Sequence, residues 1–451
     1  MITATQQSDW FLHHLSQSAG DLPGRGVDWL DSLRSDARAS IAQLPVLNRQ
    51  QEAWRYTSIE PLLQQRFITA AADIGAFKGL DISRWRIAGL DADRLVFVNG
   101  RLLPWLSTVA GLPQGVTMGS LRTALSTDPG QLASWFDQHS GRSGNLFTAL
   151  NSALINDGAL IRIGKEVVLE KPLELIYLNP GREHSLLVQP RNLVILEQGS
   201  EATLVERFVG SEASTGFNNH LTEIQLSMGA SLDHYRLQDE SDSSFHLSSI
   251  FLSQDELSRY RGTHLSFGGS WARTDFQAVL KQPGAVCEIN GLYTVGDQQL
   301  NDFHLRIHHA APGCISRERF KGILHGKGRA VFDGHIIVDQ DAQGSDAQLS
   351  NDNLMLTRSA EVDTKPQLEI YADDVKCSHG TTVGEIDPAQ IYYLRSRGID
   401  KERALSMLSL GFAAAIGNSI KSDPLREAAE RRLTQKLDNQ ADIAGVEHNH
   451  A

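Results

Sequence analysis

A cysteine and a histidine two residues apart are the sharpest chemical feature of this sequence. Cys377 and His379 lie in the run Asp-Asp-Val-Lys-Cys-Ser-His-Gly, which covers residues 373–380. In an extended strand, residues i and i+2 project to the same side, so the two side chains could hold a soft or borderline metal such as iron. Lys376 would favour the thiolate. Two ligands do not complete a metal site, so a partner chain or small thiols would supply the rest. The alternative is a structural cysteine with a hydrogen-bonded histidine at a strand end.

Histidines also recur upstream of this run. His304, Arg306 and His308 alternate, so on a strand they share one face while His309 points the other way. His325 and His335 follow. Imidazole is a common metal ligand, but polar faces of stacked strands also carry such residues as solvated or laddered side chains, and we favour that second interpretation.

Paired carboxylates offer an enzyme interpretation of the same region. A carbohydrate-active β-helix would need two carboxylates flanking a groove, and the candidates are Asp339, Asp341, Asp352, Glu361 and Asp363. We favour the interpretation that they are ordinary turn and polar-face residues. The sequence has no G-x-x-x-x-G-K-[ST] loop, no G-x-S-x-G elbow and no H-E-x-x-H pair, which counts against a self-contained enzyme.

Composition limits the classes of protein further. At 451 residues the chain exceeds one hydrophobic core, so two or three regions are expected. A net charge of −12 argues against nucleic-acid binding. No apolar stretch reaches the roughly 20 residues of a membrane span, and no secretory signal is visible at the N-terminus. Three cysteines form no disulfide framework, so a reducing cytoplasm is the expected compartment.

Hydrophobic periodicity predicts how these residues are positioned. Residues 1–157 form a mostly helical domain in which Trp29 to Ile41 recur at helical spacing until Pro45. Asn99-Gly100 predicts a hairpin turn. Asn145 is the expected N-cap of a further helix that Gly158 would end.

From about residue 158 to 384 the pattern changes to short alternating strands separated by small-residue turns. This predicts an all-β region, either a solenoid such as a parallel β-helix or a stretched sandwich, with the solenoid favoured. Helices return in 385–439, where Asp387-Pro388 and Asp400 are helix starts, and residues 440–451 are expected to be a flexible tail.

Several segments together resemble the SufB/SufD family of the SUF iron–sulfur cluster assembly machinery. An N-terminal E-x-W-[RK]-Y-T segment matches Glu52 to Thr57, and Phe97-Val98-Asn99-Gly100 matches the next landmark. Residues 145–173 resemble the entry to that family's β-helix. The most specific match is the run from Val375 to Gly384, which continues to Gly398.

The resemblance implies a fold and partners. It implies a right-handed parallel β-helix between helical domains, a complex with a SufB-like sister chain and a SufC-like ABC ATPase, and no catalytic residues of its own. His379, with Cys377 beside it, would lie at the sister-chain interface and share a transient iron–sulfur cluster. The C-terminal helices would dock the ATPase through Asp387, Pro388, Tyr392, Tyr393, Leu394, Arg395, Arg397, Leu408 and Phe412.

Departures from the family pattern refine this expectation. SufB-like chains often carry an N-terminal CxxCxxxC-type cluster, which is absent, so the SufD-like branch is favoured and no stably bound cofactor is expected on this chain. The resemblance permits a homodimer of the isolated chain and leaves open whether a reduced flavin joins the complex. A carbohydrate-active enzyme and a simple self-association module remain the alternative functions.

Overall fold

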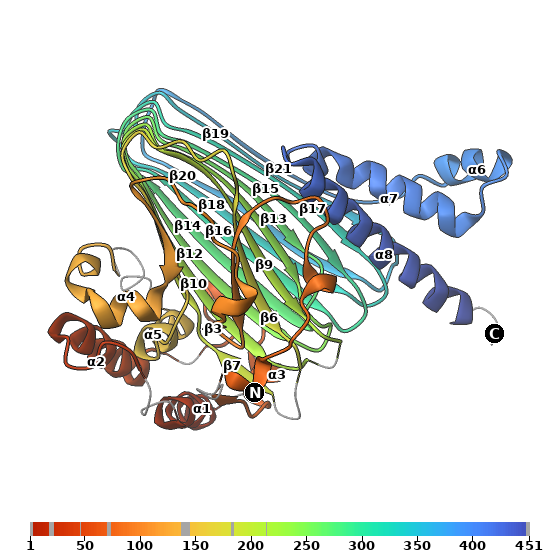
Figure 1. Ribbon diagram of the computed structural model, residues 1–451. Coiled ribbons are helices and arrows are strands. Elements are labelled where there is room, and N and C mark those ends of the chain that lie inside the picture. The colour runs from red at the N-terminus through yellow and green to blue at the C-terminus, as the bar shows by residue number, and fades with distance from the viewer. Residues whose placement is uncertain are drawn as a thin grey trace.

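The computed structural model describes residues 3–17, 22–45, 47–69, 74–136, 145–181, 185–212 and 214–447. It is a parallel β-helix with helices at both ends (Figure 1), so the predicted fold class is confirmed. Strands alternate between two sheets. Sheet 1 contains β4 (Val116–Ser120), β5 (Ala159–Ile163), β8 (Arg191–Leu196), β10 (Phe217–Leu226), β12 (Phe245–Gln254), β14 (Trp271–Leu280), β16 (Leu300–His309), β18 (Arg329–Val338) and β20 (Glu361–Ile370), with β1 (Ile68–Thr69) and β7 (Leu186–Val188) beside them. Sheet 2 contains β3 (Arg101–Leu102), β2 (Asp93–Val98), β6 (Leu173–Asn179), β9 (Glu201–Gly210), β11 (Ser231–Asp239), β13 (Arg259–Ser266), β15 (Val286–Val295), β17 (Ile315–Leu324), β19 (Ser345–Met355) and β21 (Val375–Glu385).

Each coil of the solenoid uses one strand from each sheet. Trp271 pairs in parallel with Leu300, 29 residues later, and Val286 pairs with Ile315 at the same interval. Side chains that alternate inward fill the space between the sheets, where Leu196, Phe276, Ile289 and Phe332 are among the buried residues. The coils therefore stack in register, so one inward position lies directly above the same position in the next coil.

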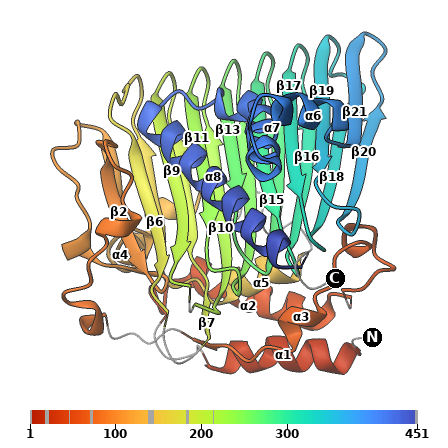
Figure 2. The ribbon, with the colours of Figure 1, turned by 90° about the vertical axis from the view of Figure 1, so that its right-hand side faces the viewer.

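The two ends of the solenoid differ. At the N-terminal end, sheet 1 finishes in β4, which pairs antiparallel with β5, and sheet 2 finishes in the two-residue strand β3. At the C-terminal end, the full-length strands β20 and β21 are the last members of their sheets, and no strand in the described ranges pairs with their outer edges. Figure 2 shows this end beyond β18 and β19.

Strands of the N-terminal region belong to both sheets, so the sheets begin before residue 158. Asn99 and Gly100 have φ of 48° and 77° and join β2 to β3, which confirms the predicted hairpin. Asn145 caps α5 (Leu146–Ala153) by accepting a hydrogen bond from the Phe147 amide at 2.8 Å, as predicted. The remaining N-terminal helices are α1 (Ala4–Gln17), α2 (Asp28–Gln43), α3 (Glu60–Leu63) and α4 (Leu121–Thr127).

Gly158 does not cap α5, and that prediction is wrong. The helix ends at Ala153, and the C-cap is Leu154. A Cβ on Gly158 would lie 1.8 Å from the carbonyl oxygen of Arg191, and its φ is 149°. Close approach to the neighbouring coil therefore requires glycine here.

Three helices follow the solenoid. They are α6 (Pro388–Ser396), α7 (Lys401–Gly417) and α8 (Asp423–Glu447). Asp387 and Asp400 cap α6 and α7 through side-chain hydrogen bonds of 2.8 Å, as predicted. Because α8 continues to Glu447, the C-terminal helical region extends past its predicted boundary at residue 439. Residues 448–451 lie outside the described residues.

Candidate functional site

The exposed strand β21 carries the cysteine and the histidine singled out above. Its inward-facing residues pair in register with buried residues of β19: Cys377 with Ala347 and His379 with Leu349. His379 is exposed although Leu349 is buried, because no further coil covers β21. The same contrast holds for Thr381 and its buried partner Asn351. The last coil therefore presents an interior surface to the outside.

Cys377 has a different environment from the one predicted. It is half-buried and packs against the core, and this burial raises the pKa of its thiol. The expectation that Lys376 would favour the thiolate is wrong, because neighbouring residues on a strand project to opposite faces. In the isolated chain Cys377 is a neutral thiol at neutral pH.

The two donors do not form a metal site within this chain. In the part of the chain that the structure describes, no three histidine, cysteine or carboxylate side chains converge as a metal-binding group. A ligand set that includes His379 or Cys377 would need donors from another molecule.

Among the described residues, the histidines upstream of Cys377 do not converge on one point, and two of them pair with different carboxylates. His304 Nε2 lies 3.0 Å from Asp302, and His308 Nε2 lies 2.9 Å from Asp339. His309 points inward and is buried, as the alternation predicted. These imidazoles pair with separate carboxylates, which supports laddered polar residues over a metal centre at this face.

The carboxylates considered as a catalytic pair also contact other side chains. Asp339 lies beside His308, Asp352 accepts a hydrogen bond from the Thr382 hydroxyl at 2.7 Å, and Asp363 lies 2.9 Å from Arg329. Glu361 also lies 3.8 Å from Arg329, so this pair of acids faces a cation. The arrangement does not support the carbohydrate-active interpretation, which requires two acids that face one substrate.

Sequence reasoning missed a buried acid beneath this end. Glu318 on β17 is the register partner of Leu349, so it lies two strands below His379 on the same inward face. It is fully buried, and neither carboxylate oxygen has a hydrogen-bond partner of normal geometry among the described residues. Burial raises the pKa of Glu318 to about 8, an effect that the nearby Ser316 hydroxyl only partly offsets. The sequence signal that could have found Glu318 is its place among the inward-facing residues of the alternating strand β17.

A pH-dependent contribution to stability follows from Glu318. Because its folded pKa lies above the ordinary value of 4.5, the native state keeps a proton that the unfolded chain releases. The contribution is complete below about pH 4.5 and is lost as the pH rises through about 8. At about 1.4 kcal/mol per pKa unit, the loss is on the order of a few kcal/mol. We expect Glu318→Gln to flatten the dependence of the unfolding free energy on pH between 5 and 9, measured by urea denaturation.

The exposed acid Glu256 supplies the control for this experiment. Glu256→Gln should leave the slope of stability against pH unchanged. A Glu318→Gln protein with the wild-type slope would contradict the assignment of a buried neutral carboxyl.

The predicted docking helices differ in how tightly they are held. No residue of α6 is buried, and Figure 1 shows this helix projecting away from the sheets. Tyr392 and Tyr393 on α6 are 76% and 57% exposed. Leu408 and Phe412 on α7 are half-buried. Helix α6 contacts α7 but none of its own residues is buried, so it presents an exposed surface.

Helix α8 lies across the outer face of sheet 2 (Figure 2). Its buried stripe packs with apolar residues of the sheet, and the members of this cluster include Leu425, Ala429, Leu433, Leu437, Tyr235, Leu265 and Phe267. Helix α7 packs against β15 and β17. These helices are therefore attached to the coils, whereas α6 is not.

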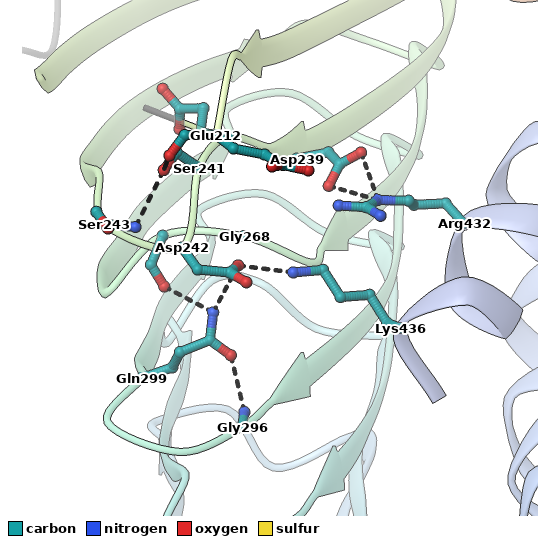
Figure 3. Close-up of polar contacts among 12 residues, drawn as sticks. Glu212, Asp239, Ser241, Asp242, Ser243, Gly268, Gly296, Gln299, Arg432 and Lys436 are labelled. Carbon is teal, nitrogen blue, oxygen red and sulfur yellow. Dashed lines mark hydrogen bonds and ion pairs between the residues drawn. The ribbon is translucent and has the colours of Figure 1, made fainter. Parts of the chain in front are cut away.

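Ion pairs reinforce the attachment of α8 (Figure 3). Both carboxylate oxygens of Asp239 accept from Arg432 Nε at 2.7 Å, and Asp242 lies 2.6 Å from Lys436 Nζ. Asp242 also accepts from Gln299 Nε2 at 3.1 Å, which ties this contact to the next coil. We name this set of contacts the α8 seam.

Comparison with known proteins identifies the class of this scaffold. The family model for the SUF system FeS cluster assembly SufBD core domain matches residues 178–412, and the model for the SufBD protein N-terminal region matches residues 5–175. The chain therefore belongs to the SufBD family of iron–sulfur cluster assembly proteins.

Individual relatives agree with this assignment. The chain is 34% identical to the iron–sulfur cluster assembly protein SufD of Escherichia coli, over 86% of this chain and 89% of that protein. It is 31% identical to an iron–sulfur cluster assembly SufBD family protein of Synechocystis, over 86% of both chains. Protein ABCI7, chloroplastic, of Arabidopsis thaliana is 28% identical over 94% of this chain and 90% of that protein. Within the described residues, no helix is long and apolar enough to span a membrane.

Proposed function

We propose that this chain is a non-catalytic scaffold subunit of a SUF iron–sulfur assembly complex, working in a reducing cytoplasm. The terminal coil would pair with a SufB-like sister chain, and α6 with the exposed part of α7 would dock a SufC-like ATPase. A nascent cluster would be cargo at the sister-chain seam. His379 would contribute an imidazole there, with Cys377 close by.

The observation that carries this proposal is the exposed interior face of β21. Positions equivalent to His379 and Thr381 are buried one coil earlier. Parallel coils are stable when they have neighbours, and long unpaired edges invite pairing with another chain. Val383 and Tyr371, exposed at 53% and 63%, add apolar area to this end. A second chain seated here would bury this surface and could bring the missing ligands to His379.

A displacement of the docked ATPase would reach the sister-chain interface through α7 and through the contacts of the α8 seam. ATP-dependent closure of the ATPase subunits would pull on α6 and α7. Because α7 and α8 are fixed to sheet 2 by apolar packing and by the pairs Asp239–Arg432 and Asp242–Lys436, the displacement would pass to the coils. Such a device needs two states that nucleotide binding biases.

The native mass of the assembly tests this function. We expect the tagged chain, expressed with its genomic neighbours, to purify with a sister chain and an ATPase, and to gain iron and acid-labile sulfide on reconstitution. Native mass spectrometry and iron and sulfide assays measure both. A chain that purifies alone or as a homodimer, and whose absence leaves iron–sulfur enzymes active, would favour the self-association module instead.

A further inference from the structure

The segment 52–58 lies outside the solenoid and has no part in the proposed function. It begins with the short helix η1 (Glu52–Trp54) and leads into α3. In Figure 2 this orange-red part of the chain, beside α3, approaches the coils near β18 and β20. Its side chains and backbone contact β14, β16 and β20 of sheet 1.

The first contacts are with β14. Trp54 is buried, and its ring centroid lies 4.0 Å from the guanidinium carbon of Arg273. Arg273 also donates a hydrogen bond to the Ala53 carbonyl at 2.8 Å. Next to it, the Trp271 indole donates to the Ser58 carbonyl at 3.0 Å. The segment therefore satisfies side-chain donors of β14 with its backbone.

Buried charges extend this contact to β16. Arg273 lies between two acids, 2.8 Å from Asp275 on its own strand and 2.7 Å from Asp302 on β16. Thr57 donates its hydroxyl to the same Asp302 carboxylate at 2.5 Å. Asp302 is fully buried although it faces outward, because the segment covers it. Against the opposing effect of burial, His304 first, then the Arg273 guanidinium and the Thr57 hydroxyl, hold the pKa of Asp302 low, at about 2.

The last contact is with β20, whose Lys365 also faces β18. Glu52 forms an ion pair with Lys365 on β20, and a hydrogen bond from Gln367 on the same strand also favours its charged form and lowers its pKa. Lys365 Nζ lies 3.7 Å from Asp333 on β18. Asp333 and Lys365 are register partners, so Glu52 adds an anchor from a distant part of the sequence to the outermost strand.

Through these contacts the segment can hold in place the strands at the C-terminal end of the solenoid, where β20 and β21 are the last members of their sheets. The strand β20 has a hydrogen-bonded neighbour on one side only, and a solenoid coil depends on its neighbours for order. We propose that residues 52–57 are a positioning segment that holds β16, β18 and β20 in the arrangement that the sister chain meets. This inference rests on the proposed function of the terminal coil as the docking edge.

One exposed and one buried member of the segment, Glu52 and Thr57, allow a graded test. The variant Glu52→Gln removes the charge opposite Lys365, and Thr57→Val removes the hydrogen bond to Asp302 without changing the side-chain shape. We expect amide hydrogen exchange in residues 361–370 to rise roughly two- to fivefold for Glu52→Gln, as befits an exposed ion pair. The double variant should exchange faster still, lose some thermal stability because the buried Asp302 carboxylate loses a donor, and bind a SufB-like sister chain more weakly at temperatures at which it is folded.

Two further variants make the test specific. The charge exchange Glu52→Lys with Lys365→Glu should restore slow exchange, because it re-forms the pair. Glu256→Gln removes an exposed acid outside the segment and outside the last coil, and it should leave both β20 exchange and docking unchanged.

The outcomes separate this inference from the proposed function. Unchanged exchange in β20 would overturn the inference, and so would faster exchange with normal sister-chain binding. If the wild-type chain does not bind a sister chain at all, the docking function fails. The exchange comparison would then still decide whether the segment holds the terminal strand.

Discussion

The variant His379→Ala is expected to form the complete complex but to lose most of its capacity to assemble clusters. The imidazole is exposed on β21 and makes no contribution to the core, so its loss should not disturb folding or docking. Changing even an outer-shell partner of a metal ligand reduces affinity about 10–100-fold, and loss of a ligand should reduce cluster yield at least as much. Iron and sulfide per complex after reconstitution measure the effect.

The neighbouring residues supply the controls for His379. Thr381→Ala changes the next exposed residue on the same face of β21 and should retain full cluster yield. His379→Cys offers a different donor and should restore part of the activity. If His379→Ala matches the wild type in a complex of correct mass, then His379 has no role in holding the cluster.

Loss of ATPase binding is the expected result of replacing Tyr392 and Tyr393 by alanine. Both rings are exposed on a helix with no buried residue, so the change should not affect the thermal midpoint of the isolated chain. Aromatic residues at the centre of an interface contribute about 2 kcal/mol or more each, so the double variant should weaken binding on the order of 100-fold or more. Isothermal titration with the purified ATPase measures this.

Point variants test this docking surface more cleanly than a deletion does. Removing residues 386–451 would strip α8 from sheet 2 and expose the apolar cluster that includes Tyr235 and Phe267, so lost binding could reflect misfolding. Tyr371→Ala is the matched control, because Tyr371 is an equally exposed tyrosine that lies beyond β20 rather than on α6. Normal ATPase affinity in the Tyr392/Tyr393 variant would move the docking surface elsewhere.

Local signals in the sequence predicted local structure well. The turn at Asn99-Gly100 and the caps at Asn145, Asp387 and Asp400 depend on atoms within three residues of each other. The alternating pattern predicted strands, which the structure confirms.

Contacts between distant parts of the sequence account for the errors. Gly158 is required by the Arg191 carbonyl in the next coil, which no local pattern indicates. The environment of Cys377 depends on Ala347, its partner on β19, rather than on its neighbour Lys376. The contacts of Thr57 and Glu52 join residues 245 and 313 positions apart, and such pairs become visible only when the coils are stacked.

The unequal ends of the solenoid limit how many copies can join end to end. The edge at β20 and β21 is long and regular, whereas the opposite end finishes in the five-residue β4 and the two-residue β3. A chain built in this way offers one long strand edge for pairing. Two chains that pair through this edge use it up, so assembly stops at a dimer. A solenoid with long free edges at both ends would instead polymerise into a fibre.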